Sequence, residues 1–89
     1  MKKIDKYGTI KHYNNKNQLH REGGPAIERS NGNKFWFLNG KLHREGGPAV
    51  ESTDGYKKWF LNDKRYTEQE YFNRIGIQNN NFNTDDLPL

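Results

Sequence analysis

Cysteine is absent from the 89 residues of this chain, and long hydrophobic runs are absent as well. Small secreted domains often depend on disulfides, so the lack of cysteine favours a cytoplasmic location. No apolar run approaches the roughly 20 residues that cross a bilayer. The N-terminal stretch MKKIDKYGTI lacks the apolar segment of a signal peptide. We therefore expect a cytoplasmic protein that does not contact a membrane.

Apolar residues are also scarce, since only 30% of the chain is hydrophobic and the mean hydropathy is −1.28. Aromatic residues nevertheless make up 13% of the chain, which argues against disorder. We expect one small domain of modest stability, built around a thin aromatic core. The net charge of +4 results from 15 cations interleaved with 11 anions, which permits nucleic-acid binding without requiring it.

The most conspicuous feature that is present is a repeat. The segment LHREGGPA occurs at residues 19–26 and again at residues 42–49, an interval of 23 residues. Aligned at this interval, residues 19–41 and 42–64 share a Trp-Phe-Leu segment and differ most in the turn between the constant positions. A fixed period with constant aromatic positions is typical of stacked structural repeats.

Each repeat has the sequence pattern of β structure. In the first copy, residues 25–28 begin an extended run, residues 30–32 are a turn cluster, and residues 34–38 predict an aromatic-rich strand. Asn39-Gly40 is the strongest short hairpin signal, and the following residues 41–45 predict another short strand. The sequence therefore predicts a mainly β fold, an antiparallel meander of stacked hairpins.

The aromatic strand divides its side chains between two faces. Trp36 and Leu38 point to one face, and Phe35 and Phe37 to the other. We expect the Trp/Leu face to form the continuous core. The second face, which also carries Phe60, is either covered by the LHRE segments or left free for a partner.

Both ends of the repeat region resemble caps. Residues 8–18 look like a degenerate half-repeat with one extra residue, and Thr67 and Glu70 form a capping-box pattern. An amphipathic helix over residues 68–75 is expected to end at Gly76. The predicted organisation is one repeat domain at 1–76 and a polar tail at 77–89, with the domain divided into a half-repeat at 8–18, repeats at 19–41 and 42–64, and a capping helix at 67–76.

Over residues 8–66 the chain resembles MORN repeats, whose pattern runs Asn-Gly-Lys, a His or similar residue, a Gly pair, an aromatic, then Asp-Gly and another aromatic. The positions that match are Asn39-Gly40-Lys41, His43, Gly46, Asp54-Gly55 and Trp59. The chain departs from the pattern where Arg44-Glu45 precedes the Gly pair and where Pro48-Ala49 replaces an aromatic residue. It is therefore similar to a variant of the MORN repeat.

The resemblance has functional implications. MORN-like arrays are usually non-catalytic binding or scaffolding modules. Chains with HREGGPA-type units that end in a Tyr-Thr-Glu-x-Glu helix resemble small proteins of bacteriophages and large DNA viruses. The resemblance therefore implies a viral accessory protein.

The repeated His-Arg-Glu segment is the most suggestive chemistry in the chain. An enzyme needs one set of groups that converge in a pocket, whereas a residue that recurs in every unit is most simply explained by stacking. We expect Arg of one unit to pair with Glu of the next, as a cross-strand ladder. His12, His20 and His43 lack the compact spacing of zinc ligands, and the Gly-Gly pairs lack a phosphate-binding signature. We expect no catalytic residue, no metal and no cofactor.

The leading hypothesis is a non-enzymatic protein-interaction module, a phage accessory protein that binds and inhibits a host protein such as a defence nuclease, in the manner of an anti-CRISPR protein. Partner contacts are expected at positions free of the stacking role and in the tail, namely Phe35, Tyr56, Lys57, Lys58, Phe82, Asp85 and Asp86. Two alternatives remain open. One is a nucleic-acid binder that uses cations beside aromatic rings, and the other is a homodimer or larger homo-oligomer joined through sheet edges or the tail.

Overall fold

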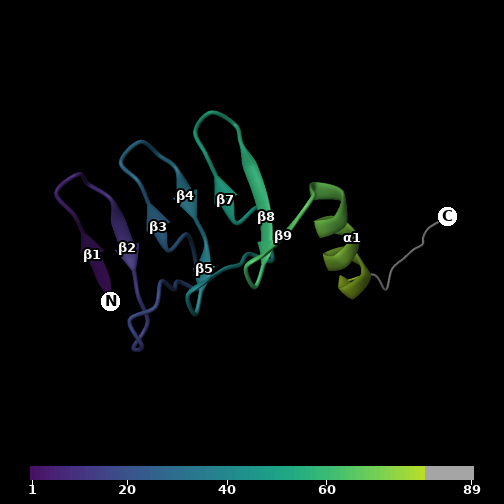
Figure 1. Ribbon diagram of the computed structural model, residues 1–89, viewed down its shortest axis with the longest axis horizontal. Coiled ribbons are helices and arrows are strands. Elements are labelled where there is room, and N and C mark those ends of the chain that lie inside the picture. Colours follow the sequence, from purple (N-terminus) through teal and green to yellow (C-terminus); the bar gives the residue numbers. More distant parts are fainter. Residues whose placement is uncertain (80–89) are drawn as a thin grey trace.

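The computed structural model describes residues 1–79, with side chains for residues 1–76. Within this part of the chain, nine short strands precede one helix (Figure 1), which confirms the predicted mainly β meander with a C-terminal helix. The elements are β1 (Lys2–Ile4), β2 (Ile10–His12), β3 (Ile27–Glu28), β4 (Lys34–Phe35), β5 (Phe37–Leu38), β6 (Lys41–Leu42), β7 (Val50–Glu51), β8 (Lys57–Leu61), β9 (Lys64–Tyr66) and α1 (Glu68–Asn79).

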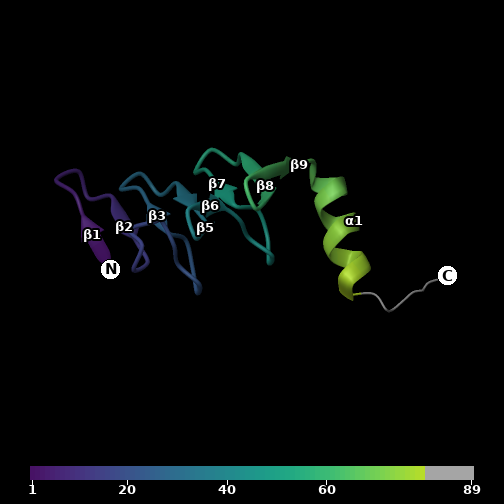
Figure 2. The same ribbon diagram turned by 60° about the horizontal axis from the view of Figure 1, so that its bottom comes forward.

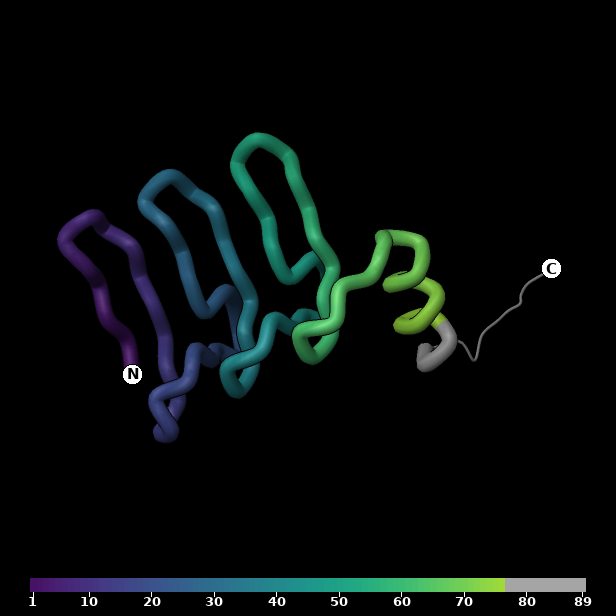
Figure 3. Tube along the Cα trace, in the orientation of Figure 1, coloured from purple at the N-terminus to yellow at the C-terminus, as the bar shows by residue number. Residues whose placement is uncertain are grey.

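The strands form a row of hairpins. Seven strands make one sheet in the order β1-β2-β3-β4-β7-β8-β9, with antiparallel pairing, and β5 and β6 pair separately. The long hairpins β1–β2, β3–β4 and β7–β8 stand side by side, with their loops at the same edge (Figure 3). The helix follows β9 at the end of this row (Figure 2).

The predicted strand at residues 34–38 changes partner at Trp36. Residues of β4 pair with β3 and β7, whereas those of β5 pair with β6. The Trp36 N–H instead donates to the carbonyl oxygen of Ala49, at 2.8 Å. The second copy changes partner at the same point, since the first half of β8 pairs with β7 and its second half, from Trp59, pairs with β9. The strand therefore changes partner at the equivalent tryptophan in both copies, although only in the first copy is it divided into two strands, β4 and β5.

The short hairpins are confirmed by their backbone angles. Asn39 and Gly40 have φ of 51° and 83°, and Asn62 and Asp63 have φ of 50° and 69°. Positive φ at both central residues is the geometry of the type I′ turn that two-residue hairpins prefer. The predicted strand at residues 41–45, however, is shorter than expected. It ends at Leu42, because the chain then leaves the hairpin to bend through the Gly-Gly segment.

The N-terminal unit is longer than the predicted half-repeat at 8–18. It begins with β1, which pairs with β2 from Lys2 to Ile4. The His12 N–H donates to the carbonyl oxygen of Ala26 at 2.8 Å, as Trp36 does to Ala49 one unit later. The extra residue lies in the loop at 15–17, where Asn17 has φ of 63°. Residues 2–4 share no repeat motif with the later copies, so only strand pairing places them in a unit.

The capping box is present, but the helix is longer than predicted. Thr67 N–H donates to Glu70 Oε1 at 2.9 Å, and Glu70 N–H donates to Thr67 Oγ1 at 3.1 Å. The helix continues through Gly76 to Asn79. Gly76 does not have the positive φ of a left-handed helix cap, so it does not terminate the helix.

The core differs from the predicted Trp/Leu face. The buried apolar residues are Ala26 and Ala49, both 0% exposed, and Tyr71, at 1%. Trp36 and Trp59 are only partly buried. Each alanine lies where the chain enters the sheet between two units, and both its backbone groups bond to neighbouring strands. Such a close backbone approach leaves space for only a methyl group.

Candidate interaction surface

The pairing register assigns the strand residues to two faces of the main sheet. Directly opposed residues of antiparallel strands lie on the same face, and successive residues alternate between faces. One row, which defines the open face, consists of Lys3, Lys11, Ile27, Phe35, Val50 and Lys58. The adjacent row, which defines the arginine face, consists of Ile4, Ile10, Glu28, Lys34, Glu51 and Lys57.

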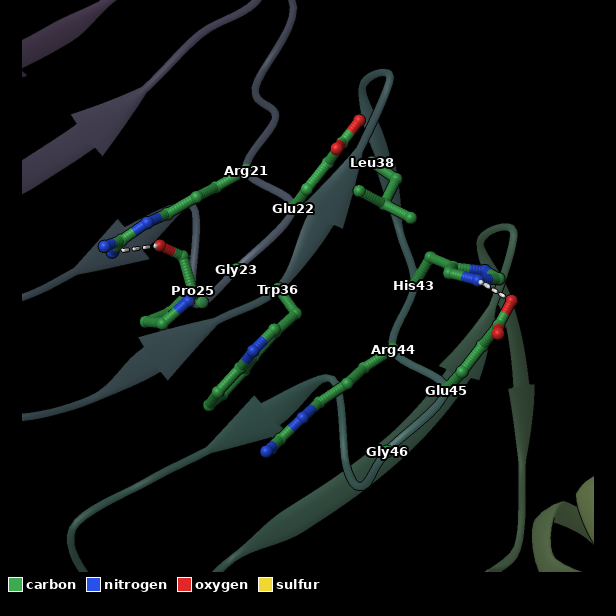
Figure 4. Close-up of a pocket in the computed structure, with 11 residues that line it drawn as sticks. Arg21, Glu22, Gly23, Pro25, Trp36, Leu38, His43, Arg44, Glu45 and Gly46 are labelled. Carbon is green, nitrogen blue, oxygen red and sulfur yellow. Dashed lines mark hydrogen bonds and ion pairs between the residues drawn. The ribbon is translucent and has the colours of Figure 1, made fainter.

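The arginine face is covered by side chains from the repeated loops. Arg44 Nη1 lies 3.1 Å from Glu51 Oε2, and its guanidinium lies 3.9 Å from the ring centroid of Trp36 (Figure 4). In the preceding copy, Arg21 Nη1 lies 3.7 Å from a carboxylate oxygen of Glu28. Each arginine thus pairs with the glutamate seven residues later in its own repeat. The predicted ladder between arginine and glutamate of adjacent repeats is wrong, because the loop folds back on its own strand.

The helix also packs on the arginine face. Tyr71 donates its hydroxyl proton to the Arg44 carbonyl oxygen at 2.6 Å and accepts a hydrogen bond from Gly47 N–H at 3.2 Å. Its ring lies 6.3 Å from Trp59, which projects to the same face as Lys57. Burial raises the pKa of Tyr71 above its ordinary value. In the last unit, the helix therefore covers Trp59 at the place where the arginine of a further repeat would lie, as Arg44 does over Trp36.

The two repeated histidines support the turns that follow them. Nδ1 of His20 accepts a hydrogen bond from Asn39 N–H at 2.9 Å, and Nδ1 of His43 accepts one from Asn62 N–H at 3.0 Å. The other ring nitrogen of His43 lies 3.1 Å from Glu45 (Figure 4). These bonds require an unprotonated Nδ1, so each neutral ring carries its proton on Nε2. The same structural contact recurs in both copies.

A hollow of about 610 Å³ lies between the two LHREGG segments (Figure 4). Its lining combines Trp36 and Leu38 with the charged side chains of the two loops. Among the described residues there is no group of three side chains that could hold a metal ion. His12, the last residue of β2, has its pKa lowered by burial and by the nearby cations Arg21 and Lys2.

The open face has the opposite character. Ile27, Phe35 and Val50 form a continuous apolar stretch across three neighbouring strands, and each keeps intermediate exposure. Arg29 lies over the Phe35 ring, 5.5 Å from its centroid. Lysines occupy both ends of the row, and the row contains no carboxylate. In the described part of the chain, every contact within 4 Å between a basic and an acidic side chain involves the repeated histidines or arginines, so none neutralises these cations.

The structure separates the predicted contact residues. Phe35 and Lys58 share the open face and are two strand spacings apart, about 10 Å. Lys57 lies on the arginine face, and Tyr56 is 68% exposed in the adjoining hairpin loop. The predicted tail contacts lie outside the described residues, namely Phe82, Asp85 and Asp86.

Sequence reasoning missed the rest of the open face. Lys3 and Lys11 belong to the N-terminal unit, whose first strand has no repeat motif, and Ile27 and Val50 are β-branched residues that carry no signal beyond strand propensity. The alternation of each strand predicts which of its own residues share a face. The register between strands was needed to join them into one row.

Comparison with known proteins finds no family model, no curated protein and no solved structure that matches the chain. The surface therefore has to be interpreted from its own chemistry. Over the residues that the structure describes, no helix is both long enough and apolar enough to cross a membrane.

Proposed function

We propose that this protein is a non-enzymatic protein-interaction module that binds a partner protein through the open face of its sheet. The observation that carries the proposal is the contrast between the two faces. The arginine face is occupied by the molecule's own side chains and helix, whereas the open face presents apolar residues between lysines. An apolar centre surrounded by polar groups is the usual arrangement of a protein interface.

The use of the repeated His-Arg-Glu segments supports a non-catalytic role. The histidines accept hydrogen bonds from turn backbones, and the arginines bond to the carbonyl oxygens of Pro25 and Pro48. A group that forms the same structural bond in each copy is explained without a reaction. The proposal therefore assigns these residues to holding the array in shape.

We also propose that the array is a variant of the MORN repeat and that the protein is a phage accessory factor. It would act in the host cytoplasm by binding and inhibiting a host protein such as a defence nuclease. The support is the period of 23 residues and the stacked hairpins.

Affinity purification tests this function. The full chain, carrying a removable tag, is incubated with a lysate of the host cell, and proteins retained in stoichiometric amount are identified by mass spectrometry. We expect one protein partner that also binds as a purified component, measured by calorimetry. Recovery of no partner that binds when purified contradicts the proposed function.

A further inference from the structure

We infer that the open face recognises an acidic protein surface that has an apolar centre. This inference rests on the proposed function and specifies the chemistry of the partner. Its basis is the segregation of charge between the faces of one thin sheet, together with the position of the apolar residues.

The arginine face carries charges of both signs. Across its strands, Glu28, Lys34, Glu51 and Lys57 alternate in sign at directly opposed positions. Arg21 and Arg44 add cations beside the two glutamates. Opposite charges at opposed positions stabilise a sheet. Both carboxylates of this row are therefore paired with arginines of the same face.

The row of the open face, in contrast, contains lysines and no carboxylate. Lys3 and Lys11 lie directly opposite each other, although like charges in this position are destabilising. Lys3 instead lies over the Tyr13 ring, 5.3 Å from its centroid. Lys58 lies at the other end of the row, and Arg29 lies over Phe35. A row that carries cations and no carboxylate attracts an anionic partner and orients its approach.

The apolar residues determine where such a partner would be dehydrated. Ile27, Phe35 and Val50 occupy the centre of the row, on β3, β4 and β7. Because the helix and the arginine loops pack on the other face, these side chains remain partly exposed. Covering them removes apolar surface from water, whereas the flanking lysines remain at a hydrated rim.

The strand order specifies the spacing of the partner's acidic groups. Lys11 on β2 and Lys58 on β8 are separated by four strand spacings, about 19 Å. A matching partner carries carboxylates on both sides of an apolar group, roughly 20 Å apart. This requirement is met by a protein surface or a short helix of about 13 residues.

The same residues argue against nucleic acid as the occupant. Single-stranded nucleic acids stack successive bases on successive aromatic rings. Within the six-residue row the one ring is Phe35, which lies between two β-branched side chains and beneath Arg29. The neighbouring Tyr13 ring is covered by Lys3. A second copy of this chain is disfavoured as well, because two open faces would oppose lysines to lysines.

Titration with synthetic probes tests the inference. The ¹⁵N-labelled full chain is titrated at physiological salt with a 16-residue glutamate-rich peptide that has two central leucines. The other two probes are the lysine-rich counterpart and a single-stranded 12-nucleotide DNA. We expect amide shifts at Lys11, Ile27, Phe35 and Lys58 with the acidic peptide alone.

Adjacent lysines on opposite faces supply a matched pair of variants. Lys58→Glu reverses a charge on the open face, and we expect it to weaken binding of the acidic peptide roughly fivefold or more. Lys57→Glu makes the same change on the arginine face and is expected to leave the affinity within about twofold. Circular dichroism and melting temperature establish that both variants fold.

Four results would overturn the inference. They are equal effects of the two substitutions, shifts confined to the arginine face, tighter binding of the DNA than of the acidic peptide, and a dimer that buries the open face. If a purified host partner binds Lys58→Glu as tightly as wild type, this inference fails while the proposed function stands. If no host partner is found, the proposed function fails, and the peptide titration still reports the chemistry of the face.

Discussion

Replacing His43 with leucine tests whether the repeated histidines hold the array together. Leucine has a similar volume, so the packing around this residue, which is 9% exposed, is largely retained. The substitution removes the Nδ1 acceptor of Asn62 N–H, whose N···N distance is 3.0 Å. It also removes the contact with Glu45, whose side chain is 74% exposed.

The expected loss of stability follows from these two contacts. A neutral intramolecular hydrogen bond contributes about 1 kcal/mol net. The contact of the neutral His43 Nε2–H with the exposed Glu45 carboxylate contributes between about 0 and 0.5 kcal/mol. We therefore expect His43→Leu to lower the free energy of unfolding by about 1 to 1.5 kcal/mol. In a domain of this size, that corresponds to a melting temperature lower by roughly 5 to 10 °C.

Urea denaturation followed by tryptophan fluorescence measures this change, because Trp59 lies close to the affected turn. His43→Asn is the matched variant, since the asparagine side-chain oxygen can take the place of Nδ1 as the acceptor. We expect it to recover more than half of the lost stability. His20→Leu repeats the test in the first copy, where Asn39 N–H donates to His20 Nδ1 at 2.9 Å. Unchanged stability of His43→Leu, or equal losses for leucine and asparagine, would refute the reasoning.

Three further predictions address packing, ionisation and backbone geometry. Tyr71→Phe removes two hydrogen bonds and is expected to cost about 2 kcal/mol in urea unfolding. Burial raises the pKa of Tyr71 above 10.0, so the folded protein retains the phenol proton more strongly than the unfolded chain. The stability of the wild type should therefore decline relative to that of Tyr71→Phe as the pH rises above 10.0. A stability difference between the two proteins that stays constant with pH contradicts this prediction. Ala49→Leu overfills a site that is 0% exposed and should cost about 1 to 3 kcal/mol, which an unchanged melting curve would disprove. Gly32→Ala should lower the melting temperature more than Gly55→Ala, because both glycines have φ near +98° but only a Cβ at position 32 would lie 2.7 Å from Thr53 Cγ2. Thr53→Ser removes that methyl group and should abolish the difference between the two variants. A difference that remains in the Thr53→Ser background would exclude this contact as the cause.

Much of the fold was predictable because its signals are local. Asn39-Gly40 predicts a hairpin through the positive φ that two-residue turns require, and Thr67 with Glu70 predicts the start of the helix through reciprocal hydrogen bonds. The end of the helix was not predictable in this way. Glycine adopts the helical φ as readily as the positive φ of a helix cap, and Gly76 has the helical one.

The candidate surface was predicted only in part. Phe35 and Lys58 were expected partner contacts and share the open face. Lys57 was expected to join them but lies on the other face, because successive strand residues alternate. Composition and repeat variation identify positions that are free to differ, and neither specifies the side of the sheet on which a residue lies.

The sequence by itself determined the period, the stacked hairpins, the turns and the start of the capping helix, since each depends on residues a few positions apart. Only the tertiary structure decided which strands pair beyond Trp36, which residue Nδ1 of His43 accepts a hydrogen bond from, and which face each lysine occupies. Those features depend on register between strands that are distant in sequence. A shift of one residue there would exchange the two faces while leaving every local signal unchanged.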